Sequence, residues 1–454
     1  MTLLAADPTP LSLPLTDAIE RALEHNRSVL GARFNAQASE FDIVQQDAAF
    51  DFRVAPQTTA SSGETSDSFG YGMTVARKIT WGTDISAGLN MNRTTSDYAD
   101  PVTSGRLSVR VDQPLFREAG RLVQLEPLRL AQNRYQASLR LLESTKADIV
   151  LAVVERYQDV LRLEQLLAAD AQRVQRLNKL QRLTALREKQ GRATRLDAMR
   201  VELQAGQAQT SQESHRAELD AARRAFADLL GEPPDRRYIL APPPRLDLEL
   251  PAPECATATA LSNRLDYAQA LQDSTDAKRG ERIAKKRLWP NLRLTSSLEQ
   301  NGAGDGFSEA TDFGGSTWFF GLSGDSDLLR RRDRAGYQAA SVSTSATLLN
   351  GEIVRDRIVR EVYDELSGYR RAEQEFVIAA RNLDVASRRL QLADRLFRMG
   401  RTDNISVTDA EEAFLLAQNE ENSASAEASV SAYRVLRAMG TLIETPPELK
   451  PSAM

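Results

Sequence analysis

Apolar residues recur at spacings of three and four over residues 358–397, which alternate almost without fault after the first two steps. Charged or amide side chains fill most positions between them. This spacing is typical of the seam of a coiled coil, in which one face of a helix meets a partner helix. It predicts a long helix here, and a looser series over residues 153–177 predicts another in the first half. The seam positions of the second half are Ile358, Val362, Leu366, Tyr369, Ala372, Phe376, Ala379, Leu383, Ala386, Leu390, Ala393 and Phe397.

The distribution of proline shows how far such helices can extend. No proline lies in residues 128–232 or in residues 291–445. Because a proline inside a helix costs about 3 kcal/mol or more, these stretches allow helices of unusual length. A helix of about 70 residues would be on the order of 100 Å long, too long for a compact globular core. Seven of the 18 prolines fall in residues 233–253, which predicts an extended connector between two halves.

The two halves resemble each other. AIERALEHNRSV at 18–29 matches ATALSNRLDY at 258–267 with an offset of 238, and QGRATRLDA at 190–198 matches MGRTDNISV at 399–407 with an offset of 209. The offset falls because the first half contains an additional stretch, residues 69–93, with two alternating runs around the letters WGTD. Such a pattern is typical of a β-hairpin. We therefore predict a duplicated chain with one inserted hairpin.

Each half is predicted to contain a helix, strands, a long helix, a turn and a medium-length helix. The helices are expected at 15–50, 122–190, 195–231, 255–288, 327–399 and 404–440. The predicted plan is an N-terminal extended segment (1–14), a first repeat (15–232) with strands at 53–113 and a turn at 191–194, a proline-rich connector (233–254), a second repeat (255–441) with strands at 291–324 and a turn at 400–403, and a C-terminal tail (442–454).

Both predicted turns between helices carry a glycine followed by a residue that can cap a helix. Gly191 and Gly400 suit the left-handed conformation that ends a helix. Thr194 and Asp403 are suited to cap the returning helices, and Asp197 falls at the third position of the first one. These residues predict two α-helical hairpins.

The predicted strands hold the glycine, small polar and aromatic residues that the helices lack, and the stretches 107–111 and 291–299 alternate apolar and polar positions. Alternation with aromatic residues near strand ends is typical of the wall of a membrane β-barrel with an aromatic girdle. A small soluble sheet that caps a coiled coil would show the same pattern, so both structures stay open at this point. The girdle candidates are Phe69, Tyr71, Trp81, Trp318 and Phe319.

Composition argues against several classes of function. A net charge of −5 argues against a nucleic-acid binder, and no stretch approaches the roughly 20 apolar residues of a transmembrane helix. The single cysteine, Cys255, excludes an intrachain disulfide and is expected to be packed. The two histidines lie far apart, so we expect no enzyme active site, no metal site and no cofactor. Residues 1–14 show no signal-peptide pattern, which leaves a cytoplasmic chain or a removed targeting segment open.

Several motifs together resemble the TolC-like outer-membrane efflux proteins. They are the opening LTDAIERALEHNRSVL and its echo ATALSNRLDYAQA, the strand-to-helix junction VDQPLFREAGR, the turn and return GRATRLDAMRVELQ, and LLGEP at the end of the first half. The resemblance covers about residues 13–440. Its specificity comes from the order, repetition and spacing of these motifs.

The resemblance implies a mainly α-helical fold with a β-barrel part. Three identical protomers would together close one barrel in the cell outer membrane, in contact with its lipid, and continue as an α-helical tunnel in the periplasm. The implied partners are a periplasmic adaptor (membrane fusion) protein and an inner-membrane pump. The implied function is passive conduction of a substrate to the exterior, in efflux or type I secretion, with no catalytic residue.

The resemblance also implies functional residues. A gate would lie just after the hairpin turns, where Asp409 matches one family aspartate, Ser406 replaces another, and Asp197 corresponds in the first half. Asp197 is also explained as a helix cap, and Asp409 as an exposed carboxylate in the first turn of a helix. The exposed turns are the natural place for adaptor contact, and their residues are Gly191, Arg192, Thr194, Gly400, Arg401 and Asp403.

Two features depart from the family pattern. The basic stretch SGDSDLLRRRDR at 323–334 replaces an expected proline junction, and the hairpin at 69–93 exceeds four strands per protomer, which leaves the strand count of a barrel open. The alternative function is a soluble or periplasmic coiled-coil scaffold, such as the adaptor itself. Adaptors typically carry one long helical hairpin, whereas two recur here.

Overall fold

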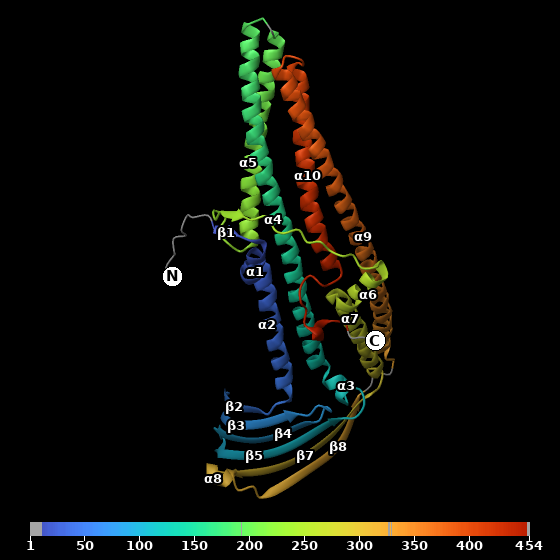
Figure 1. Ribbon diagram of the computed structural model, residues 1–454. Helices are drawn as coiled ribbons and strands as arrows, with labels where there is room; N and C mark the ends of the chain where they lie inside the picture. Colours follow the sequence, from blue (N-terminus) through green and yellow to red (C-terminus); the bar gives the residue numbers. More distant parts are fainter. Residues whose placement is uncertain (1–10, 192, 326, 328, 452–454) are drawn as a thin grey trace. The chain divides into compact units, whose positions relative to one another are not determined.

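A computed structural model describes residues 11–191, 193–325, 327 and 329–451 of the chain (Figure 1). The chain divides into two compact units. The first comprises Met1–Phe34, Arg140–Ala268 and Val354–Met454, and the second comprises Asn35–Leu139 and Gln269–Ile353.

Helices make up most of the described chain. They are α1 (Leu15–His25), α2 (Arg27–Asp47), α3 (Arg121–Gln124), α4 (Glu126–Lys189), α5 (Arg195–Leu229), α6 (Pro253–Asn263), α7 (Leu265–Lys286), α8 (Phe307–Ala310), α9 (Arg331–Arg398) and α10 (Asn404–Ala438). The strands are β1 (Leu11–Leu13), β2 (Arg53–Ser62), β3 (Ser66–Lys78), β4 (Asp84–Ser96), β5 (Ala99–Pro114), β6 (Tyr238–Leu240), β7 (Asn291–Gly304) and β8 (Gly315–Asp325).

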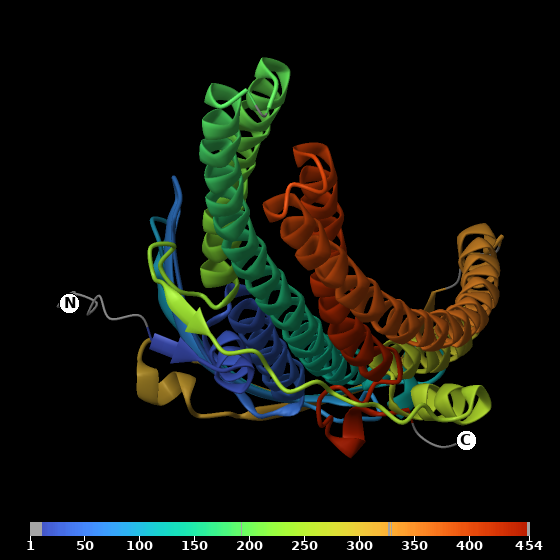
Figure 2. The ribbon, with the colours of Figure 1, turned by 45° about the horizontal axis from the view of Figure 1, so that its top comes forward.

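The first unit contains two helical hairpins. Its part of α4 pairs with α5, and its part of α9 pairs with α10, so that the helices lie side by side in the order α5, α4, α10 and α9 (Figures 1 and 2). Side chains join neighbours in this order: Asp170 of α4 contacts His215 of α5 at 2.5 Å, and Arg176 of α4 contacts Glu411 of α10 at 2.6 Å. Every predicted seam residue over 358–397 is buried or half-buried, which confirms the coiled-coil prediction.

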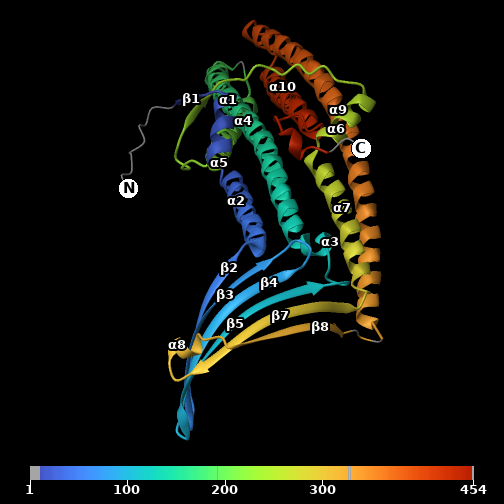
Figure 3. The same ribbon diagram turned by 90° about the horizontal axis from the view of Figure 1, so that it is seen from below.

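The second unit is built on an antiparallel sheet with the strand order β2-β3-β4-β5-β7-β8, and Figure 3 shows these strands side by side. The predicted inserted hairpin is present, because β3 and β4 pair in register from Ser66 opposite Ser96 to Lys78 opposite Asp84. The first half therefore supplies four strands of this sheet and the second half supplies two. The short helix α8 packs over glycines of β5 and β7, where a Cβ on Gly105 would lie 2.3 Å from the carbonyl oxygen of Ala310.

The duplication is visible in the backbone. Helices α5 and α10 each have 35 residues and begin 209 positions apart. Gly231 and Gly440, which follow these helices at the same offset, both take positive φ, 74° and 68°. The predicted offset of 238 recurs between Asn26 and Arg264, which interrupt the first helical segment of each half.

These interruptions correct the prediction of one helix over 15–50 and one over 255–288. Asn26 is extended, with φ −63° and ψ 130°, and its side chain accepts the N–H of Ser28 at 2.8 Å, so that it caps α2. Arg264 is also extended, with φ −69° and ψ 125°. The helix predicted over 122–190 is likewise interrupted, at Leu125. Apolar periodicity continues through a single break of this kind, so periodicity alone did not detect it.

Candidate functional site

The turns of the two hairpins lie beside each other and border a cavity of about 660 Å³. Thr184 and Arg187 of α4, Asp197 of α5 and Phe397 of α9 contribute to its wall. Of the predicted tip residues, Gly400, Arg401 and Asp403 line it as well. The structure thus brings the second turn and the start of α5 together, and the predicted tip residue Arg192 lies outside the described residues.

The local chemistry of both turns agrees with the prediction from sequence. Gly191 and Gly400 have φ of 72° and 71°. Thr194 and Asp197 form a reciprocal capping box, in which the Thr194 oxygen accepts the Asp197 N–H at 3.2 Å and the Asp197 carboxylate accepts the Thr194 N–H at 3.0 Å. The Asp403 carboxylate accepts the N–H of the residue three positions later at 3.0 Å.

Hydrogen bonds make both capping carboxylates stronger acids. The hydroxyl and N–H of Thr194 hold the pKa of Asp197 below its ordinary value. The N–H and hydroxyl of Ser406 lower the pKa of Asp403 in the same way. Hydrogen bonds that favour the charged form of a carboxyl group lower its pKa. Both caps are therefore ionised at neutral pH.

The three gate candidates all have partners within the chain. Asp197 and Ser406 serve in the two caps, and the Ser406 hydroxyl donates to Asp403 at 2.8 Å. The Asp409 carboxylate forms an ion pair with Arg389 of α9, and both side chains are exposed. An arginine beside this carboxylate reduces the negative potential that Asp409 alone would present.

Two contacts between the hairpins were not predicted from sequence. The Arg187 guanidinium lies 4.0 Å from the ring centre of Phe397 and donates to the Phe397 carbonyl oxygen at 3.0 Å. The Arg176 guanidinium lies 2.6 and 2.9 Å from the two carboxylate oxygens of the buried Glu411. These partners are more than 200 positions apart, and no local pattern marks such a pair.

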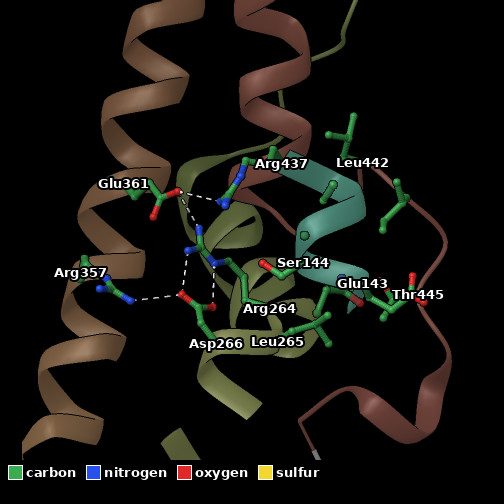
Figure 4. Close-up of a pocket in the computed structure, with 14 residues that line it drawn as sticks. Glu143, Ser144, Arg264, Leu265, Asp266, Arg357, Glu361, Arg437, Leu442 and Thr445 are labelled. Atoms are coloured by element: carbon green, nitrogen blue, oxygen red, sulfur yellow. Dashed lines mark hydrogen bonds and ion pairs between the residues drawn. The ribbon is translucent and has the colours of Figure 1, made fainter. Parts of the chain in front are cut away.

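A second cavity of the first unit, of about 570 Å³, contains a network centred on Arg264 (Figure 4). The Arg264 side chain is 8% exposed and contacts Asp266 and Glu361, each at 2.8 Å. Arg357 lies 3.3 Å from Asp266, and Arg437 lies 3.6 Å from Glu361.

The network shifts the pKa values of Asp266 and Arg264 in opposite directions. Burial tends to raise the pKa of Asp266, but the hydrogen bonds and charge of Arg264 outweigh this effect and lower it. The same carboxylates raise the pKa of Arg264 despite its burial. Three arginines (Arg264, Arg357 and Arg437) and three acids (Glu143, Asp266 and Glu361) line the cavity, so their formal charges balance. The network joins the start of α7 to α9 and α10 and leaves no net charge for a ligand.

The register of the sheet gives it two unlike faces. Side chains alternate between faces along a strand and match across paired strands. One face carries Tyr71 opposite Met91, and Leu298 opposite Trp318. The other carries polar residues, for example Arg106, which is opposite Asn90 on one side and Asn301 on the other. One apolar and one polar face suit a sheet that separates lipid from water.

The girdle candidates occupy different places on this sheet. Phe69 and Tyr71 share the apolar face, with ring centres 6.3 Å apart. Trp318 lies on the same face and is 77% exposed. Phe319 pairs with Ser297 and therefore lies on the polar face. Trp81 is exposed in the loop between β3 and β4.

The described residues thus define a protein with two antiparallel helical hairpins and an open two-faced sheet. Solved structures with this fold include the outer membrane protein VceC of Vibrio cholerae, with a TM-score of 0.72, 16% identity, and coverage of 94% of this chain and 96% of that chain. The Campylobacter jejuni CmeC outer membrane channel matches with a TM-score of 0.75, 11% identity, and coverage of 95% and 86%. The open state of the Neisseria gonorrhoeae MtrE outer membrane channel matches with a TM-score of 0.69, 17% identity, and coverage of 94% and 89%.

No protein-family model and no curated protein matches the chain by sequence. The solved structures nevertheless extend over almost the whole chain, and the chain has the TolC-like fold of these outer-membrane channels. The fold predicted from the repeated hairpins is confirmed.

Three further observations concern chemistry and membranes. Cys255 is exposed, which corrects the expectation that it is packed. Within the described part of the chain, no three or more His, Cys, Asp or Glu side chains are grouped so as to hold a metal ion. No described helix has an apolar stretch long enough to cross a membrane.

Proposed function

We propose that the protein is the outer-membrane channel of a tripartite efflux or type I secretion system. Three copies would enclose one water-filled passage and conduct substrate passively to the exterior. The observation that carries this proposal is the open sheet with one apolar and one polar face. A closed ring of such sheets turns its apolar face to lipid and its polar face to a lumen.

The edges of the sheet favour closure between copies. Among the described strands, β2 pairs only with β3, and β8 pairs only with β7. Strand directions alternate across the sheet, so β8 of one copy would run antiparallel to β2 of the next. Three six-stranded sheets would give 18 strands, a number at which barrels leave an aqueous channel. Closure also removes exposed edges, which otherwise promote aggregation.

The edges of the helical layer favour the same closure. The outer helix α9 exposes Ile378, Val385 and Leu392, and Met399, directly after its end, continues this spacing of seven residues. The opposite outer helix, α5, exposes Leu196, Met199 and Leu203, spaced by three and four. Both stripes have coiled-coil spacing but no partner helix in the described chain. We expect α9 of one copy to pack antiparallel against α5 of the next.

The first test is a disulfide between copies. Leu196 and Met399 lie near the two turns, and Leu203 and Leu392 each lie seven positions further from the turns. Cysteines at positions 203 and 392 should therefore meet across the contact between copies. The L203C/L392C variant is made with Cys255→Ser and exported into the bacterial envelope. We expect covalent species up to the trimer and none larger. Each single-cysteine variant serves as the control.

Two outcomes would contradict the proposal. A ladder beyond the trimer would indicate an open filament instead of a ring. Recovery as a monomer without detergent would favour the coiled-coil scaffold. The second test is planar-bilayer conductance of the purified assembly, in which no conductance under any condition would refute the channel.

The partners and the gate follow from the same proposal. A periplasmic adaptor would contact the turns at Gly191, Thr194, Gly400 and Arg401, and an inner-membrane pump would supply the substrate. The ion pair between Asp409 and Arg389 supports a gate at this position. The carboxylate charge of Asp409 would become available only when α9 and α10 move apart. The exposed apolar side chains Phe69, Tyr71 and Trp318 would contact outer-membrane lipid.

A further inference from the structure

The described residues of the basic stretch at 323–334 lie at one end of the sheet in the second unit. At this end β5 finishes at Pro114, β7 begins at Asn291 and β8 finishes at Asp325. Phe116 and Trp289 meet here with ring centres 5.6 Å apart, and Trp289 is 55% exposed. An exposed aromatic pair at the end of a sheet that has one apolar face is typical of the water–lipid boundary, where tryptophan is enriched.

A polar cavity of about 520 Å³ lies beside this aromatic pair, between the end of α7 and the start of α9. Trp289 is itself part of its wall. Arg287 and Arg332 line the cavity with no ion-pair partner among the described residues. We call Phe116, Trp289, Arg287 and Arg332 the headgroup patch.

Most other charges around the cavity already have partners. Arg117 donates to both oxygens of Asp333, at 3.1 and 3.3 Å. Asp325 accepts from the Asn291 amide at 2.8 Å, and Asp327 accepts from a backbone N–H at 3.0 Å. In total four arginines and three aspartates line the cavity, so one additional negative charge would neutralise it. The lining arginines are Arg117, Arg287, Arg330 and Arg332.

The same end of the sheet also carries an arginine beside an exposed aromatic ring. The Arg77 guanidinium lies 4.6 Å from the ring centre of the exposed Phe52. Arg77 is opposite Ile85, which places it on the apolar face. Arginines at the border of an apolar surface can bury their stems and keep their charge in water.

We infer that the headgroup patch binds the phosphate of an anionic phospholipid in the membrane leaflet on the helical side of the sheet. A phosphodiester carries the single negative charge that the cavity would neutralise, and guanidinium groups suit bidentate contact with phosphate. The aromatic pair and the apolar face would contact the acyl chains. This inference rests on the proposed function, because it requires the sheet to cross the outer membrane.

The main experiment measures which lipids stay bound. The assembled full chain is placed in nanodiscs of phosphatidylethanolamine with a minor share of phosphatidylglycerol, then released and examined by native mass spectrometry. We expect bound phosphatidylglycerol to exceed its share in the disc. Each arginine near a membrane surface contributes an attraction that corresponds to about fivefold in binding. The R287Q/R332Q variant should therefore lose most of the enrichment.

The matched control is R224Q/R355Q, which removes two exposed arginines of the first unit and should keep the enrichment. Equal enrichment in R287Q/R332Q and wild type would overturn the inference. Loss of enrichment on addition of inorganic phosphate would show a soluble-anion site and would also overturn it. A protein that fails to reach the outer membrane contradicts the proposed function, whereas one that assembles there without lipid preference contradicts only this inference.

A second measurement places Trp289 relative to the bilayer. The chain contains three tryptophans, so the W81F/W318F variant leaves Trp289 as the only one. In vesicles with brominated lipids, bromines near the headgroup should quench its fluorescence more than bromines deep in the acyl chain. Quenching at neither depth would show that the aromatic pair does not meet lipid and would refute the inference.

Discussion

The replacement of Arg264 by methionine is predicted to destabilise the first unit at neutral pH. Arg264→Met keeps the length of the side chain and removes its charge, which leaves Asp266 and Glu361 facing a cavity without their main partner. Removing one member of a buried ion pair costs about 3–5 kcal/mol, because the remaining charge stays desolvated.

The expected loss of stability in Arg264→Met lies below the range for a fully buried ion pair. The side chains of Asp266 and Glu361 are 35% and 31% exposed, so water screens part of the remaining charge. Arg357 and Arg437 also stay within reach, at 3.3 and 3.6 Å. We expect a loss of about 2–3 kcal/mol, which for a chain of this length lowers the melting temperature by about 2–3 °C.

The loss should depend on pH in a defined direction. In the wild type, the pKa of Asp266 is held below its ordinary value of 3.8, so its contribution is present above that value and lost as pH falls through the lower folded value. In Arg264→Met, the burial that remains favours the neutral carboxyl group and raises its pKa. The deficit of the variant should therefore be largest at pH 7 and shrink towards pH 4.

The assay is thermal unfolding of the detergent-purified assembly, followed by far-ultraviolet circular dichroism between pH 4 and pH 7. Arg264→Lys is the control, because it keeps a charge but loses the bidentate contact, and it should fall between the wild type and Arg264→Met. A deficit that stays constant across this pH range would refute the electrostatic reasoning. Such a result would indicate that Arg264 acts through packing.

Three further predictions concern the turns, the gate and the seam. Gly231→Ala would place a Cβ 2.3 Å from the carbonyl oxygen of His25, whereas the Cβ of Gly191→Ala would have nothing within 4 Å. Gly191→Ala therefore costs only the strain of a left-handed backbone, about 1–2 kcal/mol, and Gly231→Ala should lower the melting temperature far more. Equal shifts of the melting temperature would contradict the steric argument. Asp409→Ala should leave assembly intact and reduce cation preference in reversal-potential measurements, whereas unchanged selectivity would show that Asp409 is not at the gate. Leu390→Asp puts a carboxylate into the half-buried seam and should break assembly in size-exclusion chromatography, and a wild-type profile would count against the seam.

The parts of the fold that follow from local chemistry could be predicted from sequence. The seam of α9 depends on spacing, the turns depend on glycines with positive φ, and the inserted hairpin depends on alternation around a turn. Each of these signals is contained in a few neighbouring residues. Duplication strengthened them, because each hairpin appeared twice.

The contacts within the candidate site could not be predicted in this way. Arg187 meets Phe397 and Arg176 meets Glu411 only because two hairpins pack side by side in the first unit. The position of Phe319 on the polar face, by contrast, could have been predicted from neighbouring residues. Consecutive strand residues face opposite sides, so Trp318 and Phe319 could not both be girdle residues on one face.

The break in the first helix of each repeat shows what duplication preserves. Asn26 donates its amide to the carbonyl oxygen of Leu229 at 2.8 Å, and Arg264, 238 positions later, donates to the carbonyl oxygen of Ala438 at 3.4 Å. Leu229 and Ala438 are themselves 209 positions apart, so both breaks contact the end of the returning helix of their own repeat. The backbone arrangement is common to the two repeats, but one uses a neutral amide and the other a charged network. An offset between sequences locates such a position, whereas only its three-dimensional contacts reveal which chemistry stabilises it.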